Sequence, residues 1–220
     1  MVVTMYGIKG IEIAKYAGRA RVDLSASVTH WTKVQGDLRA FDVLRKILRE
    51  RQIVASNSEE GYIKAGQRAV CFSETPVTVM MRLFRQAECD RKTRMFLKWK
   101  PYGLSFLKVV LYQEYGGRPV LYLSQEEYHR LVIATGWEAE TAWRVVNFDY
   151  TSWDAAVDFT HEREWRTPGD VCFATLQGDG RPLAVVDKMS EREELLREFP
   201  SDENCPVRGV LCLADIRALG

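Results

Sequence analysis

Hydrophobic and polar positions along the 220-residue chain follow two periods, one typical of strands and one typical of helices. Short apolar runs predict strands at residues 27–32, 69–73, 104–112, 119–123, 143–148, 158–166, 171–174, 183–186 and 207–213. Helical periodicity or capping signals mark residues 37–51, 77–97, 124–134, 190–199 and 214–219. Strands outnumber helices and several adjoin through tight turns, which predicts an α+β fold with a mixed or antiparallel sheet and flanking helices.

Composition narrows the class of protein. Lys and Arg number 31 against 30 for Asp and Glu, so net charge does not predict bulk binding to a polyanion. The five cysteines form no CxxC pair and the three histidines lack ligand spacing, so we predict neither a disulfide framework nor a metal centre. With no apolar run of about 18 residues and no leader, we expect a cytoplasmic protein without a membrane span. No linker divides the chain, which predicts one domain over residues 1–220.

The stretch richest in functional side chains is residues 159–166, FTHEREWR, which combines carboxylates, basic groups and aromatics. In a strand, alternation would place Glu162, Glu164 and Arg166 on one face, with His161, Arg163 and Trp165 on the other. Two neighbouring carboxylates repel each other, so one is protonated or Arg166 and a cationic ligand neutralise them. We interpret Glu162 and Glu164 as a candidate catalytic pair, with a surface salt-bridge ladder as the alternative.

Polar residues at the ends of three strands are further candidates. His30 and Thr32 share a strand face and offer an imidazole and a hydroxyl to a sugar or amide, although a histidine beside a tryptophan is often structural. Ser73 ends an apolar strand before a helix start, where it could contact a ligand or simply cap the helix. Tyr102 lies beside a glycine in a turn with basic residues, where it could contact a planar ring of a ligand. Alternatively, its side chain only packs within the turn.

A local excess of positive charge lies within residues 82–100. On a helix it forms either a nucleic-acid-binding patch or an ordinary solvated face. The candidate nucleic-acid contacts are Arg82, Arg85, Arg91, Lys92 and Arg94.

Several of these motifs occur in an order that resembles a bacterial family. His30-x-Thr32, CFSETP at residues 71–76, the Tyr-Gly pair at 102–103, RPVLY at 118–122 and HEREWR at 161–166 resemble AbiGi-type abortive-infection proteins. This resemblance covers about residues 28–170 and leaves 171–220 as a C-terminal strand and helices. More distantly, the layout is similar to that of DarT-type ADP-ribosyltransferases, although it lacks their arginine near the proline.

The resemblance implies an ADP-ribosyltransferase-like fold and an NAD-binding site. His30 and Thr32 would hold the nicotinamide and its ribose, with Ser73 and Tyr102 nearby, Glu164 as the catalytic glutamate and Glu162 as its partner. The implied function is transfer of ADP-ribose to a nucleic acid or protein in phage defence or a toxin-antitoxin system. Two alternatives stay open: a non-catalytic member of the same fold that binds a cognate toxin or antitoxin, and a nucleic-acid-binding or nuclease-like protein.

Overall fold

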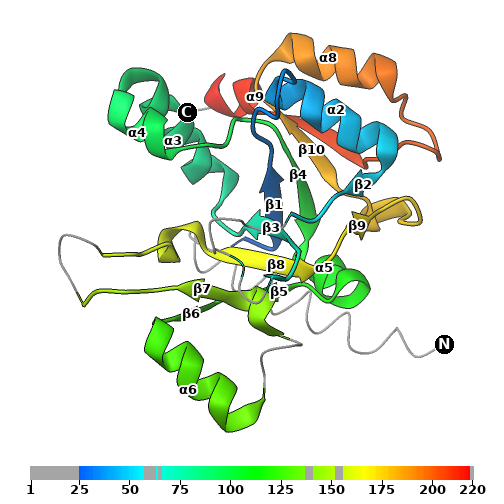
Figure 1. Cartoon of the computed structure of the whole chain (residues 1–220). Helices are drawn as coiled ribbons and strands as arrows, with labels where there is room; N and C mark the ends of the chain where they lie inside the picture. Colours follow the sequence, from blue (N-terminus) through cyan, green and yellow to red (C-terminus); the bar gives the residue numbers. More distant parts are fainter. Residues whose placement is uncertain (1–24, 57–62, 64–65, 137–140, 152–155, 219–220) are drawn as a thin grey trace.

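The computed structural model describes residues 25–56, 63, 66–136, 141–151 and 156–218, apart from the side chains of residues 94–96. These residues form a seven-stranded sheet with helices on both of its faces (Figure 1). The predicted α+β class is therefore confirmed. Among the helices of these residues, none has the length and apolarity needed to cross a membrane.

The large sheet has the strand order β11-β10-β4-β1-β3-β8-β5. Neighbouring strands are antiparallel except β10 and β11, which run parallel, as the prediction of a mixed or antiparallel sheet allows. In chain order the strands are β1 (Ser27–Trp31), β3 (Ala69–Ser73), β4 (Gly103–Leu107), β5 (Arg118–Pro119), β8 (Glu164–Pro168), β10 (Leu183–Val186) and β11 (Gly209–Cys212).

Two small sheets and seven helices surround the large sheet. The small sheets pair β2 (Gln52–Ile53) with β9 (Val171–Cys172), antiparallel, and β6 (Leu121–Leu123) with β7 (Val145–Asn147), parallel. In the described part of the chain the α-helices are α2 (Ala40–Glu50), α3 (Val77–Cys89), α4 (Arg91–Phe96), α5 (Lys108–Tyr115), α6 (Gln125–Thr135), α8 (Met189–Glu198) and α9 (Leu213–Ala218). Short 3-10 turns occur at η2 (Ala142–Arg144), η4 (Thr160–Glu162) and η5 (Gly178–Gly180).

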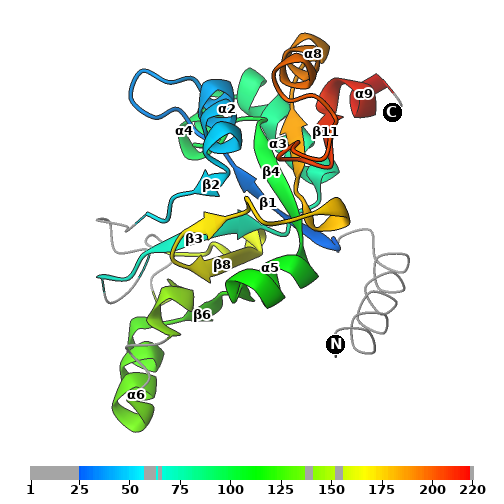
Figure 2. The same ribbon diagram turned by 90° about the vertical axis from the view of Figure 1, so that its right-hand side faces the viewer.

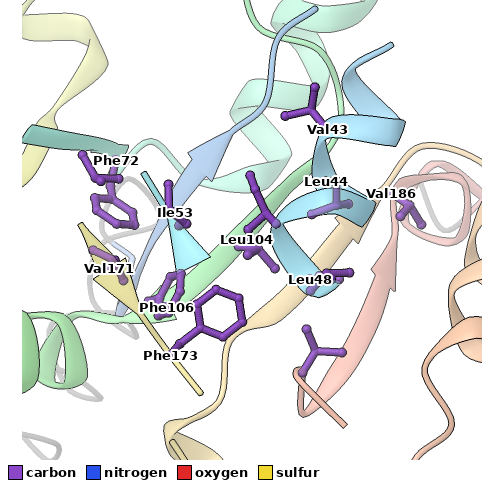
Figure 3. Close-up of a cluster of buried hydrophobic side chains, with 14 of the residues drawn as sticks. Val43, Leu44, Leu48, Ile53, Phe72, Leu104, Phe106, Val171, Phe173 and Val186 are labelled. Atoms are coloured by element: carbon purple, nitrogen blue, oxygen red, sulfur yellow. The ribbon is translucent and has the colours of Figure 1, made fainter. Parts of the chain in front are cut away.

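The two faces of the large sheet have separate hydrophobic cores. The apolar stripe of α2, which its periodicity predicts, packs with Val28 of β1 and with side chains of β3 and β4. Figure 3 shows the side chains of α2, β3 and β4 in this cluster. On the other face, Trp31 and Val185 pack against residues of α3 and α9. Figure 2 shows the sheet between these helices. Strands β10 and β11 extend the sheet from β4, so the C-terminal residues complete the same core.

The junction between β1 and β3 is unusually short. These strands pair at one position, Thr29 opposite Ser73, whereas β1 and β4 pair along five. The His30 ring lies across the junction, with its Nδ1 atom 2.9 Å from the Cys71 carbonyl oxygen. Because a carbonyl only accepts hydrogen bonds, Nδ1 carries the proton. The hydrogen bond from the His30 ring thus takes the place of a backbone hydrogen bond between β1 and β3.

The strand predicted over residues 104–112 is wrong in its second half. Strand β4 ends at Leu107 and helix α5 begins at Lys108. Between the two strands predicted over residues 104–112 and 119–123, Gly116 does not form a hairpin turn but ends α5 with a φ of 64°, and its N–H donates to the Leu111 carbonyl. A glycine that suits a hairpin therefore suits a helix C-terminus equally well.

Two predicted helix boundaries also differ. The helix expected over residues 77–97 divides at Asp90, whose carboxylate accepts hydrogen bonds from the backbone N–H groups two and three positions later and so starts α4. Helix α2 begins at Ala40 rather than at the predicted cap, Asp37. Local capping chemistry, which periodicity does not resolve, accounts for the break at Asp90.

Candidate functional site

The stretch predicted as a strand over residues 158–166 begins as a turn. Residues of η4 form a 3-10 turn, Arg163 follows in the left-handed conformation with a φ of 47°, and β8 starts only at the next residue. The Asp158 carboxylate accepts hydrogen bonds from the backbone N–H of Thr160 at 2.8 Å and from its hydroxyl at 2.6 Å. Such local bonds compete with strand pairing, which explains the error.

A buried ion pair follows this turn. Arg166 binds Glu164 through two hydrogen bonds, from Nε to Oε1 at 2.9 Å and from Nη2 to Oε2 at 3.2 Å. Nη1 of Arg166 donates to the carbonyls of Trp143 at 2.8 Å and Val145 at 3.3 Å. Glu164 is 8% exposed and Arg166 2%. This fork of charged hydrogen bonds fixes the orientation of the carboxylate and offsets the cost of burying the two side chains.

The second carboxylate of the site has a perturbed pKa. Burial first, and then the Glu164 carboxylate, raise the pKa of Glu162 from 4.5 to about 7, while Arg166 opposes them. The hydroxyl of Ser73 donates to the backbone carbonyl of Glu162 at 2.8 Å, and that of Thr75 donates to the same oxygen at 3.3 Å. The end of β3 therefore positions Glu162. Both responses expected of two neighbouring carboxylates occur here: Arg166 neutralises one, and the other binds its proton more tightly.

Two neighbours of the pair are additional to the predicted site residues. The Tyr122 hydroxyl donates to the Phe159 carbonyl at 3.1 Å and accepts from the backbone N–H of Glu164 at 3.4 Å. Cys71 lies opposite Arg166 in the sheet, and burial, then the charge of Glu164, raise its pKa well above the ordinary range, so it is a thiol. Tyr122 belongs to the RPVLY motif, but it lies on β6, which pairs with β7 in a small sheet, and its hydroxyl meets β8 only in the tertiary fold.

A row of buried polar side chains leads across the sheet to Glu164. Strand pairing aligns Ser105 with Thr29, Thr29 with Ser73, and Ser73 with Glu164. Residues paired in this way project from the same face, and all four are buried. The predicted residues Ser73 and Glu164 therefore lie side by side, and the residue of β1 that shares their face is Thr29.

His30 is directed away from this row. Since side chains alternate along a strand, His30 projects from the face opposite to Thr29, and its ring lies 5.8 Å from that of Phe72. Burial is the main cause that lowers its pKa, so the imidazole is neutral. The register does not bring His30 onto the face of Glu164.

Thr32 and Tyr102 form a structural junction elsewhere. The Thr32 hydroxyl donates to the carbonyls of Ala40 at 2.8 Å and Tyr102 at 3.1 Å, which ties β1 to α2 and to the turn before β4. The Tyr102 hydroxyl donates to the Glu191 carboxylate at 2.8 Å, and its ring packs on Phe41. Burial, and then this bond, raise the pKa of Tyr102. Of the predicted ligand contacts, only Ser73 adjoins the two glutamates.

The basic residues predicted to contact nucleic acid lie on α3 and α4. Four of them have exposed side chains: Arg82, Arg85, Arg91 and Lys92. The side chain of Arg94 lies outside the described part of the structure. In Figure 1, α3 and α4 lie at the opposite end of the molecule from α6, well away from β5.

Neither a described hollow nor a metal cluster coincides with the candidate site in the described residues. Two small hollows of about 10 Å³ each are lined by neither Glu162 nor Glu164. Among the described residues, no three His, Cys, Asp or Glu side chains form a group that could hold a metal ion.

No protein-family model, curated protein or solved structure matches the chain. The functional argument therefore depends on the geometry of the site.

Proposed function

We propose that the protein binds NAD and transfers ADP-ribose to a nucleic acid or protein, as part of a phage-defence or toxin-antitoxin system. One observation carries the proposal: the Glu164 carboxylate is paired with Arg166 through two hydrogen bonds, while the pKa of the adjacent Glu162 is raised to about 7. Two neighbouring carboxylates in different environments are the usual means of glycosidic chemistry near neutral pH.

The chemistry assigns a different role to each carboxylate. The bond between ribose C1′ and the nicotinamide nitrogen breaks, and its electron pair neutralises the positive charge of that nitrogen. Glu164 stabilises the positive charge that develops on the ribose. An acceptor oxygen or nitrogen then bonds to C1′ and loses its proton to ionised Glu162. With a pKa of about 7, Glu162 is ionised in a large fraction of molecules at neutral pH and still binds a proton readily.

The test is NAD consumption by the wild type and by Glu164→Gln, Glu162→Gln and Glu193→Gln. Glutamine keeps the shape of the side chain and removes its charge, and Glu193 is an exposed control on α8. We expect Glu164→Gln to lower turnover by about 10²- to 10⁴-fold and Glu193→Gln to leave it unchanged. Unfolding curves of each variant separate lost chemistry from lost structure. If NAD is neither bound nor consumed by the wild type, the proposal fails.

A second candidate function is nucleic-acid binding through α3 and α4. The observation that favours it is the group of exposed basic side chains at Arg82, Arg85, Arg91 and Lys92, none of which has an ion pair in the described structure. Phosphate contacts release counterions, so affinity for an oligonucleotide should fall steeply as salt rises. A double variant, Arg82→Gln with Arg85→Gln, should reduce by about two the slope of the logarithm of affinity against the logarithm of salt concentration. Binding indifferent to salt would exclude this function.

A further inference from the structure

Two arginines occupy the outer edge of the large sheet, beside the carboxylate pair. Strand β5 forms this edge and pairs with β8, with Arg118 directly opposite Arg166. Arg144 comes from η2, which also supplies a carbonyl to Arg166. The two arginines are 26 positions apart in sequence and meet only in the fold.

Both guanidinium groups are anchored on the backbone of the same short segment. Nη1 of Arg118 donates to the carbonyls of Gly117 at 2.8 Å and Tyr112 at 3.3 Å, and its guanidinium carbon lies 3.6 Å from the centroid of the Tyr112 ring. Nε and Nη2 of Arg144 donate to the Pro119 carbonyl at 3.2 and 3.1 Å. Each side chain is therefore fixed in direction before any ligand binds, and the stacking on Tyr112 adds to this.

No carboxylate of the described residues compensates the charge of these arginines. Among the described residues, neither Arg118 nor Arg144 has an ion pair with a carboxylate. Burial, and then the positive charge of Arg118, lower the pKa of Arg144. An arginine that only covered edge carbonyls would need no second cation beside it. Each guanidinium also keeps N–H donors that the carbonyls leave unused.

We propose that Arg118 and Arg144 bind the diphosphate group of a nucleotide whose ribose lies at the carboxylate pair. Phosphate oxygens match the fork of a guanidinium and would supply a negative charge that the described residues do not. Neighbouring strands are about 5 Å apart, so Arg118 on β5 and Glu164 on β8 lie within the span of one dinucleotide. A pair of cations suits a small ligand, whereas a nucleic-acid backbone requires contacts spread over several phosphates. This inference rests on the proposed function for the identity of the nucleotide.

Calorimetric titration with inorganic pyrophosphate tests the site without any turnover of NAD. We expect Arg118→Gln and Arg144→Gln each to weaken pyrophosphate binding about tenfold, which corresponds to the loss of a charged hydrogen bond. Glutamine keeps one donor for the edge carbonyl, and Arg118→Lys, which keeps the charge, should retain part of the affinity. Arg197→Gln, an exposed arginine on α8, is the control for the loss of one positive charge.

Two further ligands identify the source of the phosphate. ADP-ribose should show the same losses as pyrophosphate, whereas nicotinamide riboside, which lacks the diphosphate, should be unaffected by Arg118→Gln. The inference is overturned if the wild type does not bind pyrophosphate at millimolar concentration, or if Arg197→Gln weakens binding as much as Arg118→Gln. If pyrophosphate binding depends on Arg118 but NAD is not consumed, the diphosphate site stands and the proposed reaction fails.

Discussion

Replacing Glu162 with glutamine should change stability in a way that depends on pH. Glutamine resembles the protonated carboxyl group but does not ionise. The pKa of Glu162 is raised from 4.5 to about 7, so folded Glu162 binds its proton more tightly than the unfolded chain does. Below the lower value both states are protonated. As pH rises through the window to about 7, ionisation costs the folded wild type stability that Glu162→Gln does not lose.

The size of this stability difference follows from the pKa shift of Glu162. Each pKa unit corresponds to about 1.4 kcal/mol, so the shift of Glu162 sets an upper bound of about 3 kcal/mol. Because Glu162 is partly exposed, solvent screening lowers the expected value to about 1–2 kcal/mol. Relative to the wild type, Glu162→Gln should therefore gain about 1–2 kcal/mol between about pH 4 and about pH 8. The remaining ionisable groups are common to both proteins and largely cancel in the difference.

Urea unfolding followed by tryptophan fluorescence measures this difference, since the chain contains six tryptophans. Wild type and Glu162→Gln are compared at several pH values across the window. Glu193→Gln reports the effect of removing an exposed carboxylate, and we expect it to stay within about 0.5 kcal/mol of the wild type. A stability difference that is constant with pH, or that falls as pH rises, would refute the assignment of a raised pKa to Glu162.

Three other substitutions test the buried ion pair and two contacts elsewhere in the fold by the same unfolding measurement. Arg166→Met should destabilise by about 3–5 kcal/mol because it leaves Glu164 buried without a partner, and adding Glu164→Leu should recover most of the loss. Thr32→Val should lower the free energy of unfolding by about 1–2 kcal/mol, since the Thr32 hydroxyl binds two backbone carbonyls. Nucleotide affinity should stay unchanged. A loss of affinity without a loss of stability would contradict this structural role. Gly103→Ala should cost about 1–3 kcal/mol, because its Cβ would lie 2.5 Å from the His30 carbonyl oxygen, and a neutral result would refute that contact.

Elements with local signals could be predicted from the sequence. The strand at Ala69–Ser73 has the predicted ends because an apolar run is followed closely by a proline. Helix α6 begins where the Ser124 and Glu127 capping box predicts, and both of its reciprocal hydrogen bonds form. Where a segment fits two structures, as in α5, the apolar pattern alone did not decide between strand and helix.

The candidate site could be predicted only in part. Alternation in a strand predicts that Glu162, Glu164 and Arg166 lie together, and they do, although a 3-10 turn places Glu162 there instead of a strand. The neighbours of this group could not be found in this way, because they come from other strands. Sheet register places Cys71 opposite Arg166, and the Tyr122 hydroxyl reaches the Glu164 backbone from a separate small sheet, so both contacts depend on packing across the fold.

The described structure concentrates its energetic costs along β8 and its neighbours. Glu164 and Arg166 are buried ions, and an apolar pair of similar size would often be at least as stable. Glu162 is held against a like charge, and Arg118 lies beside a second cation. Ion pairs elsewhere, such as that joining α2 and α8 through Arg45, set opposite charges together at the surface (Figure 1). Folding alone does not require three unfavourable arrangements at one edge of a sheet, so this edge is where selection for function, rather than for stability, is expected to have acted.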